Sequence, residues 1–162
     1  MLRWLWLSFL IIALDQVTKV LAEAYLQYGP YNSVEVMPFL NWTLLYNKGA
    51  AFSFLSDAGG WQRWFFAVIA AAVSVFLIGW LHKLKQDRWL AIAVALVLGG
   101  AIGNLFDRVA YGHVIDFIDV YYQQWHWPAF NIADSAICVG AVMLVIDAFV
   151  KKPVADEKPS SS

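Results

Sequence analysis

The stretch "AFNIADSAICVGAVMLVIDAFV", from Ala129 to Val150, contains the pattern that decides the fold class. It is as long and as apolar as the roughly 20-residue helix that crosses a lipid bilayer. Yet Asp134 lies about one helical turn from its start. A carboxylate at that depth is costly, so such a residue is a candidate for function. The simpler interpretation is that Asp134 caps the helix or extends toward water.

The composition of the whole chain is also that of a membrane protein. Hydrophobic residues make up 61% of its 162 residues, and charged residues make up 14%. Average soluble domains are about 45–50% apolar and about 25% charged. A single soluble core of this size could not bury so much apolar surface, whereas lipid could. The chain has no basic patch or nucleic-acid motif, so we expect no nucleic-acid partner.

Four segments are long and apolar enough to be membrane-spanning helices. They are residues 2–22, 61–81, 89–106 and 130–150. The sequence therefore predicts a mainly α membrane protein, with one four-span domain over residues 1–152. The polar residues 153–162 are expected to form a disordered tail.

The distribution of lysine and arginine predicts the orientation of these helices. These residues are frequent at the N-terminus, in the connection 82–88 and at the C-terminal end of the fourth span. Such segments lie in the cytoplasm in most membrane proteins. Both termini are then cytoplasmic, and the longer connections 23–60 and 108–129 lie on the outer side.

The first span contains charged residues that suggest a polar inner face. Asp15 and Lys19 are four residues apart, so they share a helix face and could pair. A removable signal peptide ending near Ala22–Ala24 is the alternative. Because the polar residues interrupt the apolar run before that site, a retained helix fits better.

The two outer connections contain runs typical of strands. "FLNWTLLYNKGAAFSFL" (39–55) predicts a hairpin that turns near Asn47 and Gly49. "HVIDFIDVYY" (113–122) is rich in β-branched and aromatic residues and favours a strand, although its apolar spacing also fits a helix. We therefore expect a small β-sheet on the outer side of the membrane.

The third span ends with "LGGAIGNLFDR" (98–108), which combines small and polar residues. Its glycines allow helices to approach closely, and packing alone would explain them. Asn104, Asp107 and Arg108 then lie near the outer end of the span. The simplest interpretation of Asp107 and Arg108 is an ion pair at the membrane interface.

Asp116 and Asp134 are predicted to meet at this outer interface. Two carboxyl groups held close together do not both ionise easily, so they share one proton. The ionised carboxylate can remove a proton from water, and the protonated one can bind the carbonyl under attack and protonate the leaving amine. This is the chemistry of aspartic proteases.

Other kinds of site have weaker support in the sequence. His113, Asp116 and Asp119 recur at three-residue steps, but they do not complete a metal ligand set, and we expect no metal or cofactor. Ser135 lacks the G-x-S-x-G context of a serine nucleophile. Cys138, the single cysteine, is expected to be a small buried residue.

Three other functions fit parts of the pattern. A small transporter would use Asp15, Lys19 and Asp134 as a proton path, although the chain has no evident internal repeat. A membrane assembly factor would need the packing glycines but not the aspartates. A presenilin-like protease would also use two aspartates, but "YGHVID" before Asp116 lacks the Gly-x-Gly-Asp pattern of that family.

Five motifs, taken in order, resemble those of the bacterial lipoprotein signal peptidases, also called signal peptidase II. The resemblance extends from the first span to the fourth. The motifs are "DQVTK" (15–19), "NKGAAF" (47–52), "GGAIGNLFDR" (99–108), "VIDFI" (114–118) and "FNIADS" (130–135).

The resemblance implies an aspartic endopeptidase of the bacterial inner membrane, with its active site facing the periplasm. Such enzymes remove the signal peptide of prolipoproteins by cutting before a cysteine that carries diacylglycerol. Asp116 and Asp134 match the catalytic pair. The residues that match substrate-binding or supporting positions are Asp15, Lys19, Asn47, Gly49, Asn104, Asp107, Arg108 and Asn131.

The resemblance also implies partners. The substrates are diacylglyceryl-prolipoproteins that arrive from the surrounding membrane lipid, and the cyclic peptide globomycin inhibits the family by occupying the dyad. We expect the chain to act as a monomer without a cofactor.

Overall fold

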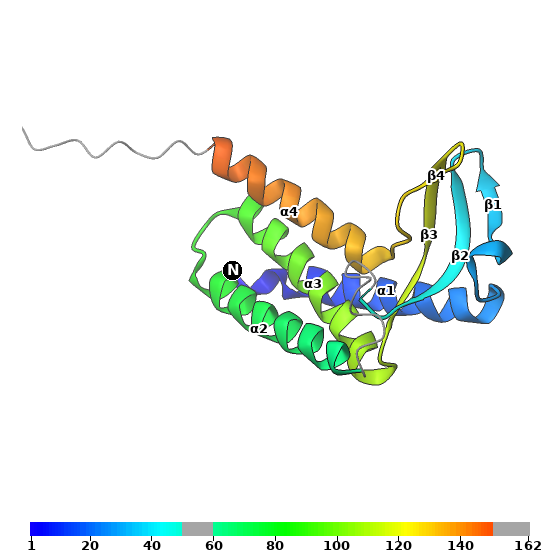
Figure 1. The fold of residues 1–162 in the computed structure, drawn as a ribbon. Helices are drawn as coiled ribbons and strands as arrows, with labels where there is room; N and C mark the ends of the chain where they lie inside the picture. The colour runs from blue at the N-terminus through cyan, green and yellow to red at the C-terminus, as the bar shows by residue number, and fades with distance from the viewer. Residues whose placement is uncertain (50–59, 151–162) are drawn as a thin grey trace, which may run out of the picture.

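The computed structural model describes residues 1–49 and 60–150 and contains four long helices beside a small sheet (Figure 1). The helices are α1 (Leu5–Tyr25), α2 (Trp61–Lys83), α3 (Arg88–Ala110) and α4 (Ile132–Val150). The strands are β1 (Val34–Met37), β2 (Leu40–Asn47), β3 (Val114–Tyr122) and β4 (Trp125–His126). Short 3₁₀ turns are η1 (Leu2–Trp4) and η2 (Pro30–Asn32).

The four predicted spans are confirmed as helices that are long and apolar enough to cross a membrane. Several boundaries differ from the prediction: α1 continues to Tyr25, α2 continues to Lys83, and α3 begins at Arg88. α3 continues to Ala110, because the polar segment at its outer end remains helical. α4 begins at Ile132 rather than residue 130, because Asn131 caps its first turn.

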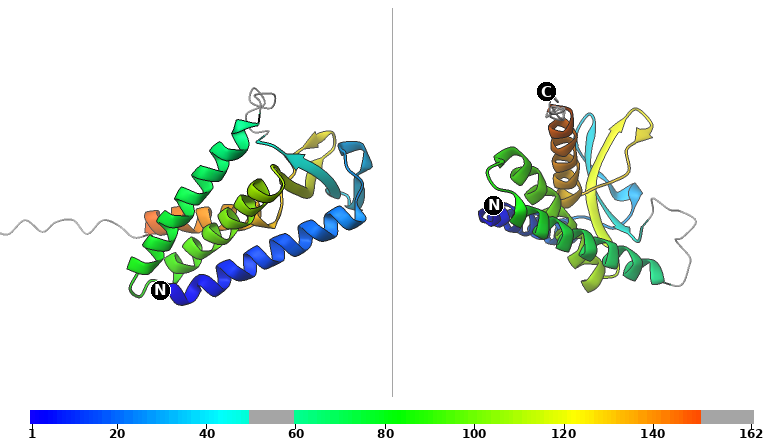
Figure 2. Two further views of the ribbon diagram at one scale, coloured as in Figure 1. Left: turned by 90° about the horizontal axis from the view of Figure 1, so that it is seen from below. Right: turned by 90° about the vertical axis from the view of Figure 1, so that its left-hand side faces the viewer.

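Helix α3 is the central helix of the bundle and packs against α1, α2 and α4 (Figure 2). In its most apolar window 56% of residues are buried, against 17–22% in the other three helices. One cluster of buried apolar side chains joins α2 to α3 and consists of Leu77, Leu81, Ala91, Val94 and Leu98. The other helices are therefore held mainly through α3.

Glycines on α3 allow unusually close contacts with α1 and α4. A Cβ atom at Gly100 would overlap the backbone carbonyl of Ala133, so α4 lies directly against this part of α3. A Cβ atom at Gly103 would lie 2.7 Å from Oδ2 of Asp15 on α1. The glycines thus serve packing, as expected, and Gly103 also makes room for a buried carboxylate.

The outward faces of the helices are apolar. Phe9, Val68 and Val75 are each about two-thirds or more exposed, as expected for side chains that contact lipid. Cys138 lies on such a face of α4 and is exposed, so the prediction that it is buried is wrong. Its neighbours Val139 and Val142 are also exposed, because this face of α4 has no protein partner among the described residues.

The sheet is antiparallel, in the order β1-β2-β3-β4, and it lies beyond the C-terminal end of α3 and the N-terminal end of α4 (Figure 1). The strand predicted for 113–122 is confirmed as β3. In the register of the two central strands Leu45 pairs with Asp116, and Asn47 pairs with Val114. Asp116 is thus held at the outer end of the helix bundle.

An apolar cluster attaches this sheet to α1. It consists of Ala22 on α1 together with Leu44, Ile115 and Phe117 on β2 and β3. The cluster fixes the height of the sheet relative to α1, and therefore the position of Asp116 relative to the polar residues of α1.

Part of the predicted outer hairpin is present as β2, which pairs with β1 and β3. The expected second arm at 50–55 lies outside the described residues, as does the tail 153–162. These two predictions remain untested.

One end of the molecule holds the N-terminus and the connection between α2 and α3. The N-terminal amine of Met1 donates to the carbonyl oxygen of Leu84, in the connection between α2 and α3, at 3.2 Å. The C-terminal end of α4 lies at the same end, far from the sheet (Figure 1). This arrangement agrees with the three segments sharing one side of a membrane.

Candidate active site

Asp116 lies on β3, and its carboxyl group is almost fully buried at 2% exposure. Two side-chain amides hold it. Asn47 Nδ2, from β2, donates to Oδ2 at 2.9 Å, and Asn131 Nδ2 donates to Oδ1 at 2.8 Å. The carboxyl group is therefore fixed in position by an adjacent strand and by the start of α4.

Asp134 lies in the first turn of α4 and is partly buried. Its backbone N–H donates to Asn131 Oδ1 at 2.9 Å, and its Oδ2 accepts from the backbone N–H of Asn131 at 3.3 Å. This reciprocal pair has the geometry of a capping box. Asp134 therefore does cap the helix, as the simpler interpretation expected. Its other oxygen, Oδ1, accepts from Asn104 Nδ2 at 2.7 Å.

Asn131 connects the two aspartates. It is fully buried, and its Nδ2 lies within 3.2 Å of Asn104 Oδ1 and 2.8 Å of Asp116 Oδ1. Its oxygen and backbone meanwhile bind Asp134. One residue therefore sets the relative positions of both carboxyl groups, through its side chain at Asp116 and through its backbone at Asp134.

Burial and, next in size, the negative charge of Asp134 raise the pKa of Asp116 from 3.8 to about 7. Hydrogen bonds from Asn47 and Asn131 act in the opposite direction. Because the two carboxyl groups interact, they titrate as a pair. Near neutral pH the pair can hold one proton, which is the state that acid–base catalysis by two aspartates needs.

A buried ionic cluster supports the pair from the side of α1. Lys19 Nζ lies 2.7 Å from Asp15 Oδ2 and 2.7 Å from Asp107 Oδ2. All three side chains are at most 1% exposed. The expected Asp15–Lys19 pair is confirmed, and Asp107 joins it because α3 packs against α1.

Asp107 therefore does not form the expected interfacial ion pair with Arg108. Its two oxygens accept from Gln16 Nε2 at 2.8 Å and from the backbone N–H of Ile115 at 3.2 Å. Arg108 instead donates to the backbone carbonyl of Asn104 at 3.2 Å. Its guanidinium interacts electrostatically with Asp134 and Asp116, so it contributes positive charge near the pair.

Asn47 and Gly49 act together on the outer side of the site. The backbone N–H of Gly49 donates to Asn47 Oδ1 at 2.8 Å, which leaves Asn47 Nδ2 facing Asp116. Gly49 has a φ of +107°, and a Cβ atom there would lie 2.7 Å from the Phe66 ring. Only glycine fits this position without strain.

Comparisons with known proteins show the family of this chain. A model of the family described as signal peptidase (SPase) II matches residues 7–150. The chain belongs to the signal peptidase II family. It is 54% identical over 159 residues to a lipoprotein signal peptidase of Aeromonas hydrophila, covering 98% of this chain and 95% of that protein. It is 59% identical over 154 residues to one from Pseudomonas fluorescens Pf-5, covering 93% and 89%.

Two solved structures, each described as a bacterial membrane enzyme, share the fold. One is 31% identical, covers 99% of this chain and 94% of its own, and has a TM-score of 0.81. The other is 34% identical, covers 93% and 94%, and also has a TM-score of 0.81. Membership of signal peptidase II and the four-helix fold with its small sheet are therefore both established.

The alternative site chemistries find no support in the described part of this signal peptidase II chain. His113 packs against Tyr46, with ring centroids 4.3 Å apart, and Asp119 binds Asn41 and His126. Within residues 1–49 and 60–150 no three metal-binding side chains form a cluster. The Ser135 hydroxyl donates to the backbone carbonyl of Asn131 and serves the helix start.

Sequence reasoning did not assign a role to Gln16. Its Nε2 donates to Asp107 Oδ1 at 2.8 Å and lies 3.4 Å from the carbonyl of Gly103. Gln16 adjoins Asp15 in the "DQVTK" motif of signal peptidase II. This position beside a predicted site residue is the feature of the sequence that could have indicated a supporting role. Gln16 faces α3 only because α1 and α3 pack closely there.

Proposed function

We propose that this chain removes signal peptides from diacylglyceryl-modified prolipoproteins, with Asp116 and Asp134 as its catalytic pair. The observation that carries the proposal is that Asn131 hydrogen-bonds to both carboxyl groups, through its side-chain amide to Asp116 and through its backbone N–H to Asp134. Membership of the family and the names of its relatives, lipoprotein signal peptidases, support the substrate class.

The raised pKa of Asp116 supports a division of roles. Asp134 is the ionised base and removes a proton from a water molecule that attacks the carbonyl carbon of the scissile bond. Asp116 is protonated and hydrogen-bonds to the carbonyl oxygen as it gains negative charge. As the C–N bond breaks, Asp116 gives its proton to the amine of the departing cysteine residue, and the pair again holds one proton, now on Asp134.

The supporting residues hold this arrangement in place. Asn104 and Asn131 orient Asp134, and Asn47 and Asn131 orient Asp116. Gly49 positions Asn47, and Arg108 contributes positive charge near the two carboxyl groups. The buried cluster of Asp15, Lys19 and Asp107 anchors the network to α1 and α3.

The substrate reaches this site from the bilayer. Its signal helix and the lipid on its cysteine are both apolar and remain in lipid until the scissile bond meets the outer ends of the spans. The cationic segments lie at the opposite end of the bundle from the sheet, which supports cytoplasmic termini and an active site on the periplasmic face of the inner membrane. One monomer contains the whole site, and globomycin-type peptides would compete for it.

The test uses purified protein in detergent and a prolipoprotein with or without diacylglycerol on its cysteine. Mass spectrometry of the products identifies the bond that is cut. The proposal predicts a single cut before the lipidated cysteine, little cleavage of the unmodified form, and no effect of EDTA. Proton flux in vesicles without any cleavage would instead favour the transporter alternative.

A further inference from the structure

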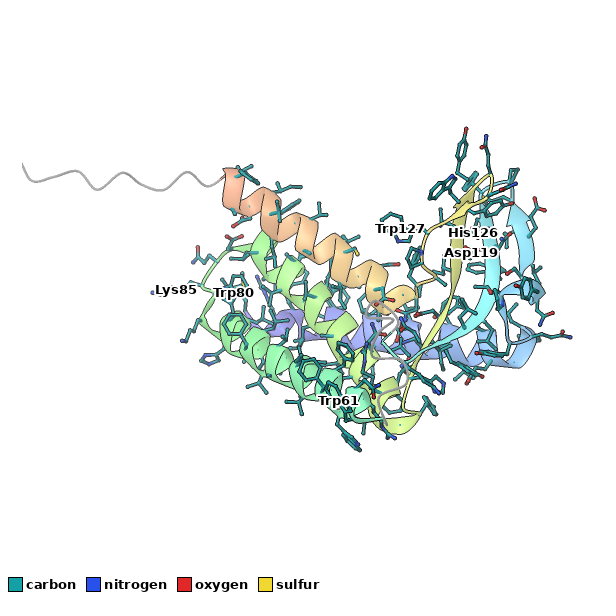
Figure 3. The ribbon with its side chains drawn as sticks, in the orientation of Figure 1. Trp61, Trp80, Lys85, Asp119, His126 and Trp127 are labelled. Atoms are coloured by element: carbon teal, nitrogen blue, oxygen red, sulfur yellow. The ribbon has the colours of Figure 1, made fainter. Side chains whose placement is uncertain are left out.

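A cavity of about 500 Å³ lies on the outer sheet beyond the two aspartates. Figure 3 labels Asp119 and His126 on the sheet and Trp127 in the connection toward α4. The side chains that decide its chemistry are Tyr31, Thr43, Leu45, Asp119, His126 and Trp127. They come from η2, from β2 to β4 and from the segment before α4, so the cavity is built by elements distant in sequence.

The cavity contains a buried hydroxyl that lacks a partner. Thr43 is 2% exposed, and its Oγ1 makes no hydrogen bond to any of the described residues. Buried polar groups in folded proteins almost always have a partner, because leaving one unpaired costs free energy. An unpaired hydroxyl on a cavity wall therefore indicates a position where a ligand group supplies the missing bond.

Asp119 and His126 supply acceptors in the cavity, whereas Tyr31 and Trp127 also carry donors. Asp119, 7% exposed, accepts from Asn41 Nδ2 at 3.0 Å and lies 2.9 Å from His126 Nδ1. A carboxylate has about four acceptor positions, so Asp119 can accept further bonds. A neutral imidazole that donates from Nδ1 has Nε2 as an acceptor. Beside Asp119 the cavity thus suits a ligand group that donates a hydrogen bond, and it disfavours a second carboxylate.

The cavity and the catalytic pair share the same strands. Leu45, on its wall, pairs with Asp116 in the sheet register, and Asp119 follows Asp116 on β3 by three residues. Three residues of a strand span about 10 Å. An extended peptide whose scissile bond lies at Asp116 would therefore reach the cavity with its second or third residue beyond that bond.

We propose that this cavity binds the second and third residues of the mature lipoprotein and favours uncharged side chains that donate hydrogen bonds, such as serine and asparagine. The proposal rests on the function proposed above. The signal-peptide side does not fit, because that apolar segment remains at the level of the helices, whereas the cavity lies on the sheet, outward of the helix ends.

The test compares three diacylglyceryl-prolipoprotein peptides that differ only at those two positions, which hold serine and asparagine, two alanines or two aspartates. Wild type is expected to cleave the serine–asparagine peptide with a kcat/KM about threefold to tenfold above the alanine peptide, as one neutral hydrogen bond would give. The aspartate peptide is expected to be the poorest substrate.

Three substitutions separate a binding role from a structural one. Thr43→Val should bring the serine–asparagine to alanine ratio close to one, and Thr43→Ser should retain it. Asp119→Asn should reduce the discrimination against the aspartate peptide. Thr18→Val changes the other threonine of the chain, whose hydroxyl donates to backbone carbonyls of α1, and should keep the wild-type ratio.

The outcomes distinguish the two proposals. If wild type cleaves none of the lipidated peptides, the proposed function itself is wrong. If it cleaves all three with equal kcat/KM, or if Thr43→Val changes the selectivity for residues before the scissile bond instead, the function stands and this subsite is wrong. Should Thr43→Val fail to fold, the Asp119→Asn result with the aspartate peptide decides.

Discussion

The Lys19 ammonium lies 3.1 Å from Asn104 Oδ1, and this contact fixes which end of the Asn104 amide faces Asp134. An ammonium group has no acceptor, so Asn104 must turn its oxygen toward Lys19. Its nitrogen then donates to Asp134 Oδ1 at 2.7 Å. A charge buried on α1 thus orients a carboxyl group on α4 through one side chain of α3.

The first prediction concerns this connection. Asn104→Leu removes the donor to Asp134 while keeping the approximate side-chain volume. We expect kcat to fall about 10- to 100-fold, because a hydrogen bond to a charged group contributes about 1.5–3 kcal/mol. KM should change little, since Asn104 positions Asp134 rather than the substrate. Steady-state cleavage kinetics would measure both constants.

The matched control is Asn32→Leu. Asn32 is an exposed asparagine of the outer connection that hydrogen-bonds only locally, to the carbonyl of Tyr28. The Asn32→Leu variant should therefore leave kcat unchanged. A normal kcat in Asn104→Leu would remove Asn104 from the catalytic arrangement.

The second prediction concerns stability. Lys19→Met leaves the buried carboxylates of Asp15 and Asp107 without their cation. Breaking a buried ion pair by removing one partner costs about 3–5 kcal/mol. Thermal unfolding in a mild detergent should show a marked loss for Lys19→Met and almost none for Lys83→Met, which changes an exposed lysine of α2. Equal stability of the two variants would contradict the structural role of Lys19.

The third prediction is a pH dependence of activity. The pair needs a proton on Asp116, whose pKa is raised to about 7, so kcat/KM should fall as pH rises through about 7 and both carboxyl groups ionise. A profile measured from pH 5 to 9 that shows no decrease above neutrality would contradict the assignment of Asp116 as the acid.

The stability of the fold should also depend on pH through Asp116. The pKa of Asp116 is higher in the folded state than its ordinary 3.8, so between about pH 4 and pH 7 the folded state binds more protons than the unfolded state. The contribution of Asp116 to stability therefore decreases as pH rises across that window. Asp116→Asn should weaken this dependence in thermal unfolding measured at the same pH values.

The fourth prediction concerns the contact between α3 and α4. Gly100→Ala introduces a Cβ atom against the carbonyl of Ala133, beside the first turn that carries Asp134. We expect a loss of about 1–3 kcal/mol from overpacking, together with reduced activity. Gly79→Ala on α2 is the control, since nothing lies within 4 Å of its added Cβ atom. There the higher helix propensity of alanine should stabilise slightly.

Local patterns predicted much of this site, and packing between helices supplied what they missed. The four-residue spacing of Asp15 and Lys19 correctly indicated their ion pair, because it depends on one helix only. Asp107 joins this pair because α1 packs against α3. A local sequence pattern does not contain that packing. Asp107 was therefore wrongly paired with its neighbour Arg108.

The difference between local patterns and tertiary packing also explains the results for β3, Asn131 and Cys138. The strand 113–122 followed from side-chain preferences, whereas the Asn131 contacts with both aspartates depend on the meeting of β3 with α4. Cys138 was wrongly expected to be buried because the apolar stretch around it does not distinguish a lipid-facing side from a protein core.

The most direct test of the central claim is cleavage of a diacylglyceryl-prolipoprotein by wild type, Asp116→Asn and Asp134→Asn, each shown to be folded by its thermal transition. Asparagine keeps the shape of each side chain but can neither carry the shared proton nor act as a base. The account predicts that each variant loses at least about 100-fold in kcat. Cleavage at a near wild-type rate by either folded variant would contradict the catalytic role of that aspartate.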